Sequence, residues 1–214
     1  MTKIKACLFD LDGVIVDTAV YHFQAWRRLA NELGFDFTEH QNEQLKGISR
    51  MESLELILGW GNISLSEEEK LNWATHKNDW YLELVKVMTP KEVLPGVKDF
   101  LLLLRENNIK IALGSASKNS KLILERIEML PYFDAIIDGN NITKGKPDPQ
   151  VFLLGAEATH CKPEDCVVFE DAVAGVQAGK AGGMRVIGVG HPDTLIEADL
   201  VISGFEEMTL EMLG

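Results

Sequence analysis

The feature that most constrains the fold of this chain is a short apolar run that ends abruptly in polar residues and precedes a helical pattern. Such runs occupy residues 4–9, 109–113, 135–137, 167–169 and 186–189. Segments with the apolar spacing of an amphipathic helix lie between them, at 97–106, 120–129 and 149–159. Strands that alternate with helices indicate a parallel sheet covered on both faces. The sequence therefore predicts an α/β fold whose core is a Rossmann-like parallel sheet.

A long interval after the first strand breaks this alternation. Residues 16–88 show helical spacing and no convincing strand. Ser66, followed by three glutamates, resembles a capped helix start. All four tryptophans of the chain fall in this interval: Trp26, Trp60, Trp73 and Trp80. We predict a core domain of residues 1–15 and 89–214, with a helical cap domain of residues 16–88 inserted after the first strand.

The composition excludes several classes of partner. The 214 residues carry 33 acids and 21 bases, a formal net charge of −12, and no run of Lys or Arg supplies a basic surface for nucleic acid. No stretch reaches the roughly 18 apolar residues that a membrane helix needs. The three cysteines form no CxxC pair, which is typical of reduced thiols. We therefore expect a cytoplasmic protein that binds neither nucleic acid nor membrane.

Carboxylates follow two of the predicted strands at the point where each strand ends. Asp10 and Asp12 come after the first strand, and Glu170 and Asp171 after the strand at 167–169. Isolated strand-end aspartates often only cap the following loop. Ligands of parallel sheets bind at the carboxyl ends of the strands, however, so these four carboxylates should converge at one rim. Because like charges repel there without a cation, and oxygen ligands suit Mg²⁺, we expect a magnesium site.

Two further residues complete a set suited to phosphoryl transfer. Ser115 follows the strand at 109–113 with a hydroxyl and backbone N–H groups that can bind phosphate oxygens. Lys146 supplies a cation on a segment stiffened by Pro147 and Pro149. A carboxylate nucleophile, Mg²⁺, a hydroxyl and a lysine are the parts of a phosphoryl-transfer site.

Four parts of the chain resemble, in order and spacing, the motifs of the haloacid dehalogenase superfamily of phosphotransferases: FDLDGVIVDT (9–18), Ser115, GKPDP (145–149) and FEDA (169–172). The resemblance implies that Mg²⁺ is required and that Asp10 is the nucleophile that forms an aspartyl phosphate. It implies that Asp12 is the general acid and base and also gives a backbone carbonyl to Mg²⁺. The side-chain ligands of the metal would be Asp10, Glu170 and Asp171, and Ser115 and Lys146 would hold the transferring phosphoryl group.

The predicted cap resembles that of the phosphomutases in this superfamily that act on β-glucose phosphates. The matching segments are DTAVYHFQAWRRLA (17–30), EQLKGISRMESLE (43–55), HKNDWY (76–81) and GSASKN (114–119). The resemblance implies that these segments supply the substrate-binding residues, namely Thr18, His22, Lys46, Gly47, Arg50, Ser53, Lys77, Ala116, Ser117, Lys118 and Asn119. Among them, Arg50 has the forked guanidinium that suits a second phosphate.

The cap residues also have plainer interpretations. His22 could be a partly buried histidine with its hydrogen bonds satisfied, and Arg50 and Lys77 could be solvated charges. Lys46 could be a surface lysine whose stem covers apolar groups. Trp26 is expected in the core rather than at a ligand.

The resemblance implies a monomeric enzyme that interconverts β-D-glucose 1-phosphate and glucose 6-phosphate through a bound 1,6-bisphosphate. The alternative is a Mg²⁺-dependent phosphatase that acts on a sugar phosphate with the same two aspartates. A non-catalytic receiver-like module fits poorly, because Asp12 and Lys146 would have no role in it. The sequence leaves the sugar open among glucose epimers and disaccharide-derived phosphates.

Overall fold

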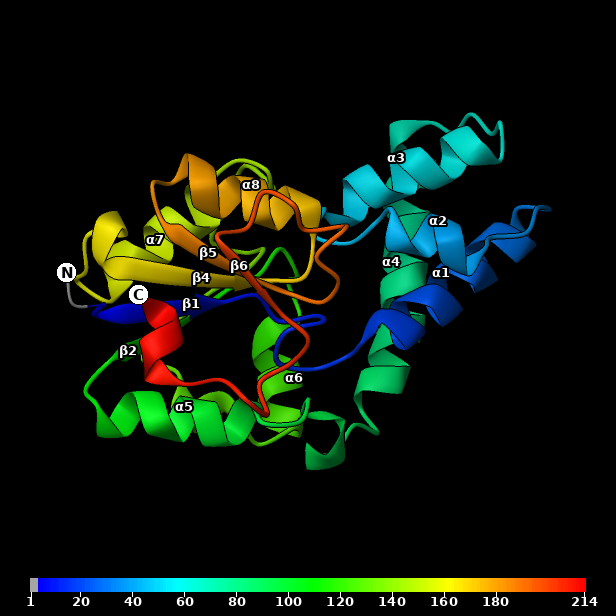
Figure 1. The fold of residues 1–214 in the computed structure, drawn as a ribbon. Helices are drawn as coiled ribbons and strands as arrows, with labels where there is room; N and C mark the ends of the chain where they lie inside the picture. The colour runs from blue at the N-terminus through cyan, green and yellow to red at the C-terminus, as the bar shows by residue number, and fades with distance from the viewer. Residues whose placement is uncertain (1–3) are drawn as a thin grey trace.

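The structure, a computed structural model, describes residues 4–214 and is built on one parallel sheet (Figure 1). The six strands lie in the order β3-β2-β1-β4-β5-β6. The strands are β1 (Ala6–Phe9), β2 (Lys110–Gly114), β3 (Ala135–Ile137), β4 (Cys166–Glu170), β5 (Arg185–Val189) and β6 (Leu200–Ile202). The helices are α1 (Ala19–Glu32), α2 (Glu39–Glu43), α3 (Arg50–Trp60), α4 (Glu67–Val85), α5 (Val97–Glu106), α6 (Ser120–Arg126), α7 (Gln150–Ala158) and α8 (Val173–Ala181).

The centre of the sheet is buried on both faces because its strands are apolar except at a few end positions. Successive side chains of a strand point to opposite faces. Accordingly, Cys7 and Phe9 of β1 pack in the cluster that contains the apolar side chains of α5 and α6. Ala6 and Leu8 pack instead in the cluster that contains those of α7 and α8. Figure 1 shows these two helix pairs on opposite sides of the sheet. The predicted α/β fold is therefore confirmed.

The order of the strands reverses at β1. This strand pairs with β2 on one side and with β4 on the other, and all of these pairs are parallel. Such a reversal leaves a crevice at the carboxyl ends of the strands, where ligands of open α/β sheets bind. The residues at the ends of β1, β2 and β4 therefore meet at this rim.

Helices α1 to α4 are inserted between β1 and β2 and stand beyond the carboxyl ends of the strands (Figure 1). They have a buried cluster of their own, which includes Trp26, Leu29, Leu54 and Ile57. The predicted start of α4 is confirmed: the Glu69 N–H donates to Oγ of Ser66 at 3.3 Å, and the Ser66 N–H donates to the Glu69 carboxylate at 2.8 Å. Trp26 lies in this core, as expected.

The insertion leaves and rejoins the sheet through two adjacent segments. Val16 and Val93 form an antiparallel bridge, and the N–H of Leu94 donates to the carbonyl of Ile15 at 3.0 Å. Two crossing segments that lie side by side are the arrangement of a hinge, since few backbone dihedrals there would move the whole insertion.

Two details differ from the sequence patterns. The helix predicted at 120–129 ends at Arg126, because Glu128 takes a left-handed φ of 58°. Strand β6, three residues at the edge of the sheet, is not predicted. Within residues 4–214, no helix has the length and apolar character needed to cross a membrane. The three cysteines are free thiols.

Candidate active site

Asp10 lies directly after β1, at the reversal of the strand order. Its backbone N–H donates to the carbonyl of Phe169 on β4 at 3.0 Å, so the strand ladder fixes its position. Ser115 is held in the same way after β2, where its N–H donates to the carbonyl of Ile137 at 3.0 Å. Both side chains are buried, with exposed fractions of 6% for Asp10 and 2% for Ser115. The sheet therefore brings the predicted nucleophile and hydroxyl to one rim.

The turn after Asp12 requires a glycine. Gly13 has a φ of 81°, and a Cβ there would lie 2.2 Å from Oδ2 of Asp171. A side chain at this position would be strained by its backbone and would also displace the Asp171 carboxylate. Gly13 therefore allows the loop after β1 to pack against the residue that follows β4, and the two carboxylate pairs meet.

Lys146 forms the centre of the group. Its ammonium donates to Oδ1 of Asp10 at 2.5 Å and to Oε1 of Glu170, and its side chain is fully buried. Burial opposes the charge on Lys146, but the carboxylates of Asp10 and Glu170 outweigh it and raise the pKa of Lys146 above its ordinary value. Lys146 is therefore a permanent cation at the point where Asp10 would attack phosphorus.

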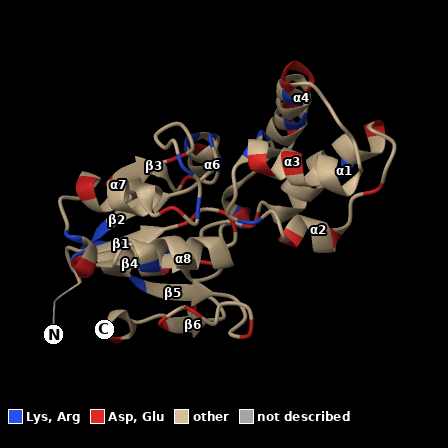
Figure 2. Cartoon of the chain, turned by 90° about the horizontal axis from the view of Figure 1, so that it is seen from above, with Lys and Arg blue, Asp and Glu red and all other residues tan. Residues whose placement is uncertain are grey.

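The remaining carboxyl groups hold protons more tightly than usual. Burial, together with the neighbouring Asp10, raises the pKa of Asp12 to about 8 and that of Asp171 to about 7. Burial likewise raises the pKa of Glu170 to about 8, although Lys146 opposes the shift. Charges of both signs occur along the loops between the sheet and helices α1 to α4 (Figure 2). Three raised pKa values at one rim mean that one lysine does not compensate the buried carboxylates.

This donor set fits a hard divalent cation. Asp10, Glu170 and Asp171 offer only oxygen atoms, which suit Mg²⁺. The raised pKa values of Glu170 and Asp171 and the ion pair of Asp10 with Lys146 indicate an excess of negative charge. As the side chains stand, residues 4–214 contain no group of three His, Cys, Asp or Glu arranged to hold a metal. The reason is visible in the ion pairs, because Lys146 holds two of the three predicted ligands.

A second group of polar side chains lies on the cap side of Asp12. The Thr18 hydroxyl donates to Oδ1 of Asp12, and Thr18 is buried. His22 on α1 lies 2.9 Å from the ammonium of Lys77 on α4, measured to Nδ1, and burial followed by the Lys77 charge lowers the pKa of His22. His22 is thus a neutral histidine with a hydrogen-bond partner. That partner, Lys77, belongs to the predicted substrate site rather than to the hydrophobic core.

Lys77 is not a solvated charge. It is 2% exposed, and its ammonium lies 4.2 Å from the ring centroid of Trp26 and 4.9 Å from that of Tyr81. Among residues 4–214 it forms no ion pair with a carboxylate, and burial, followed by the charge of Arg50, lowers its pKa well below the ordinary value. Such a cation is costly to bury unless an anion from outside the chain compensates it.

Arg50 is the second cation without a partner. It is the first residue of α3, is half-buried, and forms no ion pair with any residue from 4 to 214. Burial lowers the pKa of Arg50. Its guanidinium is therefore available to an anion. Ser53 lies one turn further along α3 and is buried.

The segment between α2 and α3 touches the catalytic rim. The Lys46 ammonium lies 3.4 Å from Oδ2 of Asp171 and 2.9 Å from the Glu43 carboxylate. Burial opposes its charge, but Asp171 and Glu43 raise the pKa of Lys46. A Cβ on Gly47 would lie 3.2 Å from that of Ala172. Lys46 is therefore held at the rim by an ion pair with Asp171.

The loop after β2 is shaped by its own hydrogen bonds. The N–H of Ser117 donates to Oγ of Ser115 at 3.2 Å, and the N–H of Asn119 donates to Oγ of Ser117 at 3.3 Å. The carbonyl of Lys118 accepts a bond from Asn140 at 3.2 Å, while the Lys118 side chain is exposed. Ala116 lies between them at intermediate burial. The predicted residues of this loop are therefore held together by local hydrogen bonds at the end of β2, the strand that neighbours β1.

Two residues of the site were not singled out by the sequence patterns. Tyr81 packs against His22 in a tilted arrangement, with 4.2 Å between ring centroids, and its buried hydroxyl forms no hydrogen bond within the described chain. Asn78 accepts a bond from the side chain of Asn119 at 2.9 Å. Both belong to the segment 76–81. Tyr81 lies four residues after Lys77, on the same helix face, and that spacing is a signal that could have found it, whereas no such spacing marks Asn78.

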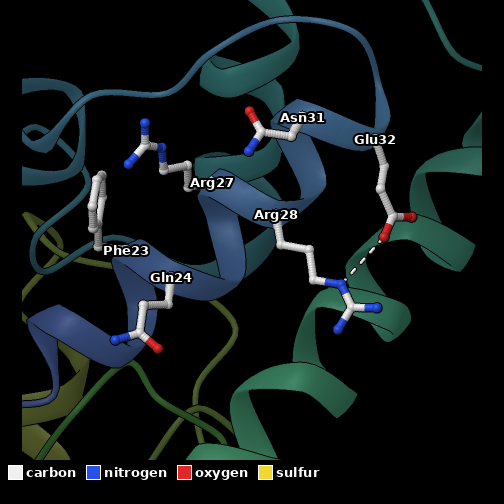
Figure 3. A pocket seen from close by; sticks show the side chains of 6 residues that line it. All are labelled: Phe23, Gln24, Arg27, Arg28, Asn31 and Glu32. Atoms are coloured by element: carbon white, nitrogen blue, oxygen red, sulfur yellow. Dashed lines mark hydrogen bonds and ion pairs between the residues drawn. The ribbon is translucent and has the colours of Figure 1, made fainter.

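A surface depression lies away from this site. A shallow depression of about 510 Å³ follows the outer side of α1 and is lined by Phe23, Gln24, Arg27, Arg28, Asn31 and Glu32 (Figure 3). Arg28 pairs with Glu32 at 3.2 Å, and Arg27 pairs with Asp36 at 3.1 Å. Because both guanidinium groups are already compensated, this depression offers no site for an anionic substrate.

Comparison with known proteins supports this geometry. The sequence pattern of the haloacid dehalogenase-like hydrolases matches residues 4–183. The chain is 44% identical to β-phosphoglucomutase of Bacillus subtilis over 98% of its length and 94% of the relative's. It is 33% identical to a phosphorylated carbohydrates phosphatase of Thermotoga maritima over 98% of both chains. A crystal structure of β-phosphoglucomutase from Clostridium difficile superposes with a TM-score of 0.94 at 44% identity, covering 98% of this chain and 95% of the other.

Proposed function

The chain belongs to the haloacid dehalogenase-like hydrolase family, and we propose that it is a β-phosphoglucomutase, which interconverts β-D-glucose 1-phosphate and glucose 6-phosphate. The observation that carries the proposal is the presence of two cation groups near Asp12, one on the core and one on the inserted helices. Lys146 serves the Asp10 side, whereas Lys77 and Arg50 lie on the cap side without any carboxylate partner in residues 4–214. A substrate with a phosphate at each end would satisfy both groups.

Asp10 acts as the nucleophile and Asp12 as the general acid and base, and these roles follow from the surroundings of each side chain. Phosphorylated Asp10 transfers its phosphoryl group to the 6-hydroxyl of β-glucose 1-phosphate, and Asp12 takes the hydroxyl proton. After the 1,6-bisphosphate has turned over, Asp10 attacks the phosphorus at C1, and Asp12 returns the proton to the departing oxygen. Because the pKa of Asp12 is raised to about 8, it can hold a proton near neutral pH, as an acid must.

Mg²⁺ would be held by the side chains of Asp10, Glu170 and Asp171 and by the backbone carbonyl of Asp12. When bound, it supplies positive charge to the transferring phosphoryl group. Lys146 adds a second positive charge at the same place, and Ser115 offers its hydroxyl and nearby N–H groups to the phosphoryl oxygens. Fixed charges of this kind account for most of the rate in phosphoryl transfer.

The helical insertion is proposed to act as a cap of residues 16–88 over this rim. Asp12 and the sugar are oriented by Thr18, His22 and Lys77. The sugar or its phosphates are contacted by Lys46, Gly47 and Ser53. The far phosphate is held by Arg50 and residues 116–119. A closed cap excludes water, so the aspartyl phosphate reacts with a sugar hydroxyl rather than with water. We also infer that the enzyme acts as a cytoplasmic monomer, in keeping with the resemblance.

Product analysis tests the proposal. The chain is incubated with Mg²⁺, β-glucose 1-phosphate and a trace of β-glucose 1,6-bisphosphate, and glucose 6-phosphate and free phosphate are followed in the same tube. We expect glucose 6-phosphate to accumulate with little free phosphate. Free phosphate as the main product would refute the mutase.

The identity to a carbohydrate phosphatase favours a sugar-phosphate phosphatase as the second candidate. Hydrolysis of a monophosphate needs no grip on a distal phosphate. Arg50→Ala therefore separates the two functions, since a mutase should lose most of its turnover, whereas a phosphatase should keep it. A panel of epimeric and disaccharide-derived phosphates, run in the same assay, identifies the sugar.

A further inference from the structure

One hydrogen bond joins the inserted helices to the loop that follows β2. The side-chain amide of Asn119 donates to Oδ1 of Asn78 on α4 at 2.9 Å, across 41 residues of sequence. Both side chains are half-buried. An amide group has one carbonyl oxygen and two N–H bonds, so Asn119 keeps a second N–H for another acceptor.

Asn78 stands at a particular place on α4. It follows Lys77, whose ammonium lies 2.9 Å from His22 and within the electrostatic reach of Asp12. A single turn of α4 therefore contacts both the acid-base side of the site and the loop 115–119. That loop also holds Asn119 through its backbone, because the Asn119 N–H donates to Oγ of Ser117.

We infer that Asn78 is a positioning residue for the distal phosphate: its side-chain oxygen orients the amide of Asn119 when α4 lies against the core. The inference rests on the proposed function, since it requires a substrate with a phosphate at the far end. Without Asn78, the Asn119 side chain rotates freely, and its N–H is no longer aimed at a phosphate oxygen. The position of the inserted helices and the binding of the distal phosphate are thereby linked through the side-chain amides of Asn78 and Asn119.

The other contacts between insertion and core do not carry this role. Lys46 pairs with Asp171, so its loss disturbs the carboxylate rim directly. Gly47 lies close to Ala172, since a Cβ there would be 3.2 Å from the Ala172 side chain, but it has no side chain that could orient Asn119. Within residues 4–214, Asn78 forms one hydrogen bond across the boundary, to Asn119, and neither residue is hydrogen-bonded to Asp10, Glu170 or Lys146.

A double-mutant cycle tests the inference on the full chain. Asn78→Ala, Asn119→Ala and the double variant are compared with wild type in the conversion of β-glucose 1-phosphate to glucose 6-phosphate. Each single variant loses the hydrogen bond that orients Asn119 toward the distal phosphate. This loss should raise KM about tenfold and change kcat far less. In the Asn119→Ala background, Asn78→Ala should have no further effect, because a residue that acts through Asn119 has nothing left to orient.

Asn72→Ala is the matched control, since Asn72 lies exposed on the same helix and the same substitution there should leave KM unchanged. Alanine favours helix, so Asn78→Ala should keep its fold, and an unchanged thermal transition checks this. Asn78→Ser is a second variant whose hydroxyl is too short to reach Asn119, and it should raise KM equally.

Two results would overturn the inference. Wild-type KM in Asn78→Ala means that Asn119 needs no orientation, and full additivity in the double variant means that Asn78 acts independently of Asn119. Failure of the proposed function appears differently, because wild type itself would then form no glucose 6-phosphate.

Discussion

Replacing Lys77 by methionine removes a buried charge while keeping an unbranched side chain of similar length. Lys77 is 2% exposed, and its polar surroundings are His22 Nδ1 at 2.9 Å and the rings of Trp26 and Tyr81. Removing an ion from water costs several kcal/mol, whereas a cation–π contact returns about 1–2 kcal/mol and a hydrogen bond to a charged group about 1.5–3 kcal/mol. The lowered pKa of Lys77 indicates that the cost is larger than the return.

We therefore expect Lys77→Met to raise the free energy of unfolding at pH 7 by about 1–3 kcal/mol, even after His22 loses its partner. Each kcal/mol corresponds to about 2–4 °C in the thermal midpoint of a chain of this size. The same substitution should lower mutase turnover, because the cation proposed to meet the substrate is gone. A stability gain with an activity loss distinguishes a functional charge from a structural one.

The pH dependence gives a second check with a defined sign. The folded-state pKa of Lys77 is lowered, whereas the unfolded chain keeps this proton up to about pH 10.4. Between these values the unfolded state binds more protons, so wild-type stability should rise with pH relative to Lys77→Met. The advantage of the variant should therefore shrink as the pH approaches 10.

Urea unfolding followed by tryptophan fluorescence, from pH 7 to pH 10, measures these differences. Lys121→Met is the control, since Lys121 is exposed and its substitution should change stability by less than about 0.5 kcal/mol. A Lys77→Met chain that is no more stable than wild type at pH 7 would refute the reasoning.

Three further predictions concern single positions. Asp10→Asn should reduce glucose 6-phosphate formation below about a per cent of wild type with an unchanged circular dichroism spectrum, and greater turnover would remove Asp10 as the nucleophile. Tyr81→Phe should raise the free energy of unfolding by about 1 kcal/mol, since the lost hydroxyl is buried without a partner, and a less stable variant in urea would contradict this. Gly175→Ala places a Cβ 1.8 Å from Oε1 of Glu170, so the Mg²⁺ concentration for half-maximal turnover should rise about tenfold or more. Gly59→Ala, with nothing within 4 Å, should leave it unchanged.

The sequence was most informative where a structural feature depends on neighbours in the chain. The apolar runs of β1, β2, β4 and β5 are local signals, because each buried strand contributes its own residues to the core. The capped start of α4 is equally local, since Ser66 and Glu69 satisfy each other's backbone groups. Edge strand β6 was not predicted from the sequence, and only its pairing with β5 shows that it belongs to the sheet.

The candidate site divides in the same way. Asp10, Asp12, Glu170 and Asp171 could be proposed from the sequence, because strand ends of a parallel sheet converge wherever the fold is an open α/β sheet. The burial of Lys77 could not be predicted from the sequence. Its neighbours along α4 do not indicate that Trp26 and His22 of α1 enclose it.

The sequence by itself therefore determined the α/β fold, the helical insertion and the types of chemistry at the strand ends, because all three depend on the order and spacing of residues. Only the tertiary structure decided which polar side chains meet: Lys146 with Asp10 and Glu170, Lys46 with Asp171, and Asn78 with Asn119. The physical reason is that these pairs lie 24 to 136 residues apart in the chain, and their distance is set by strand order and by the position of the insertion over the sheet.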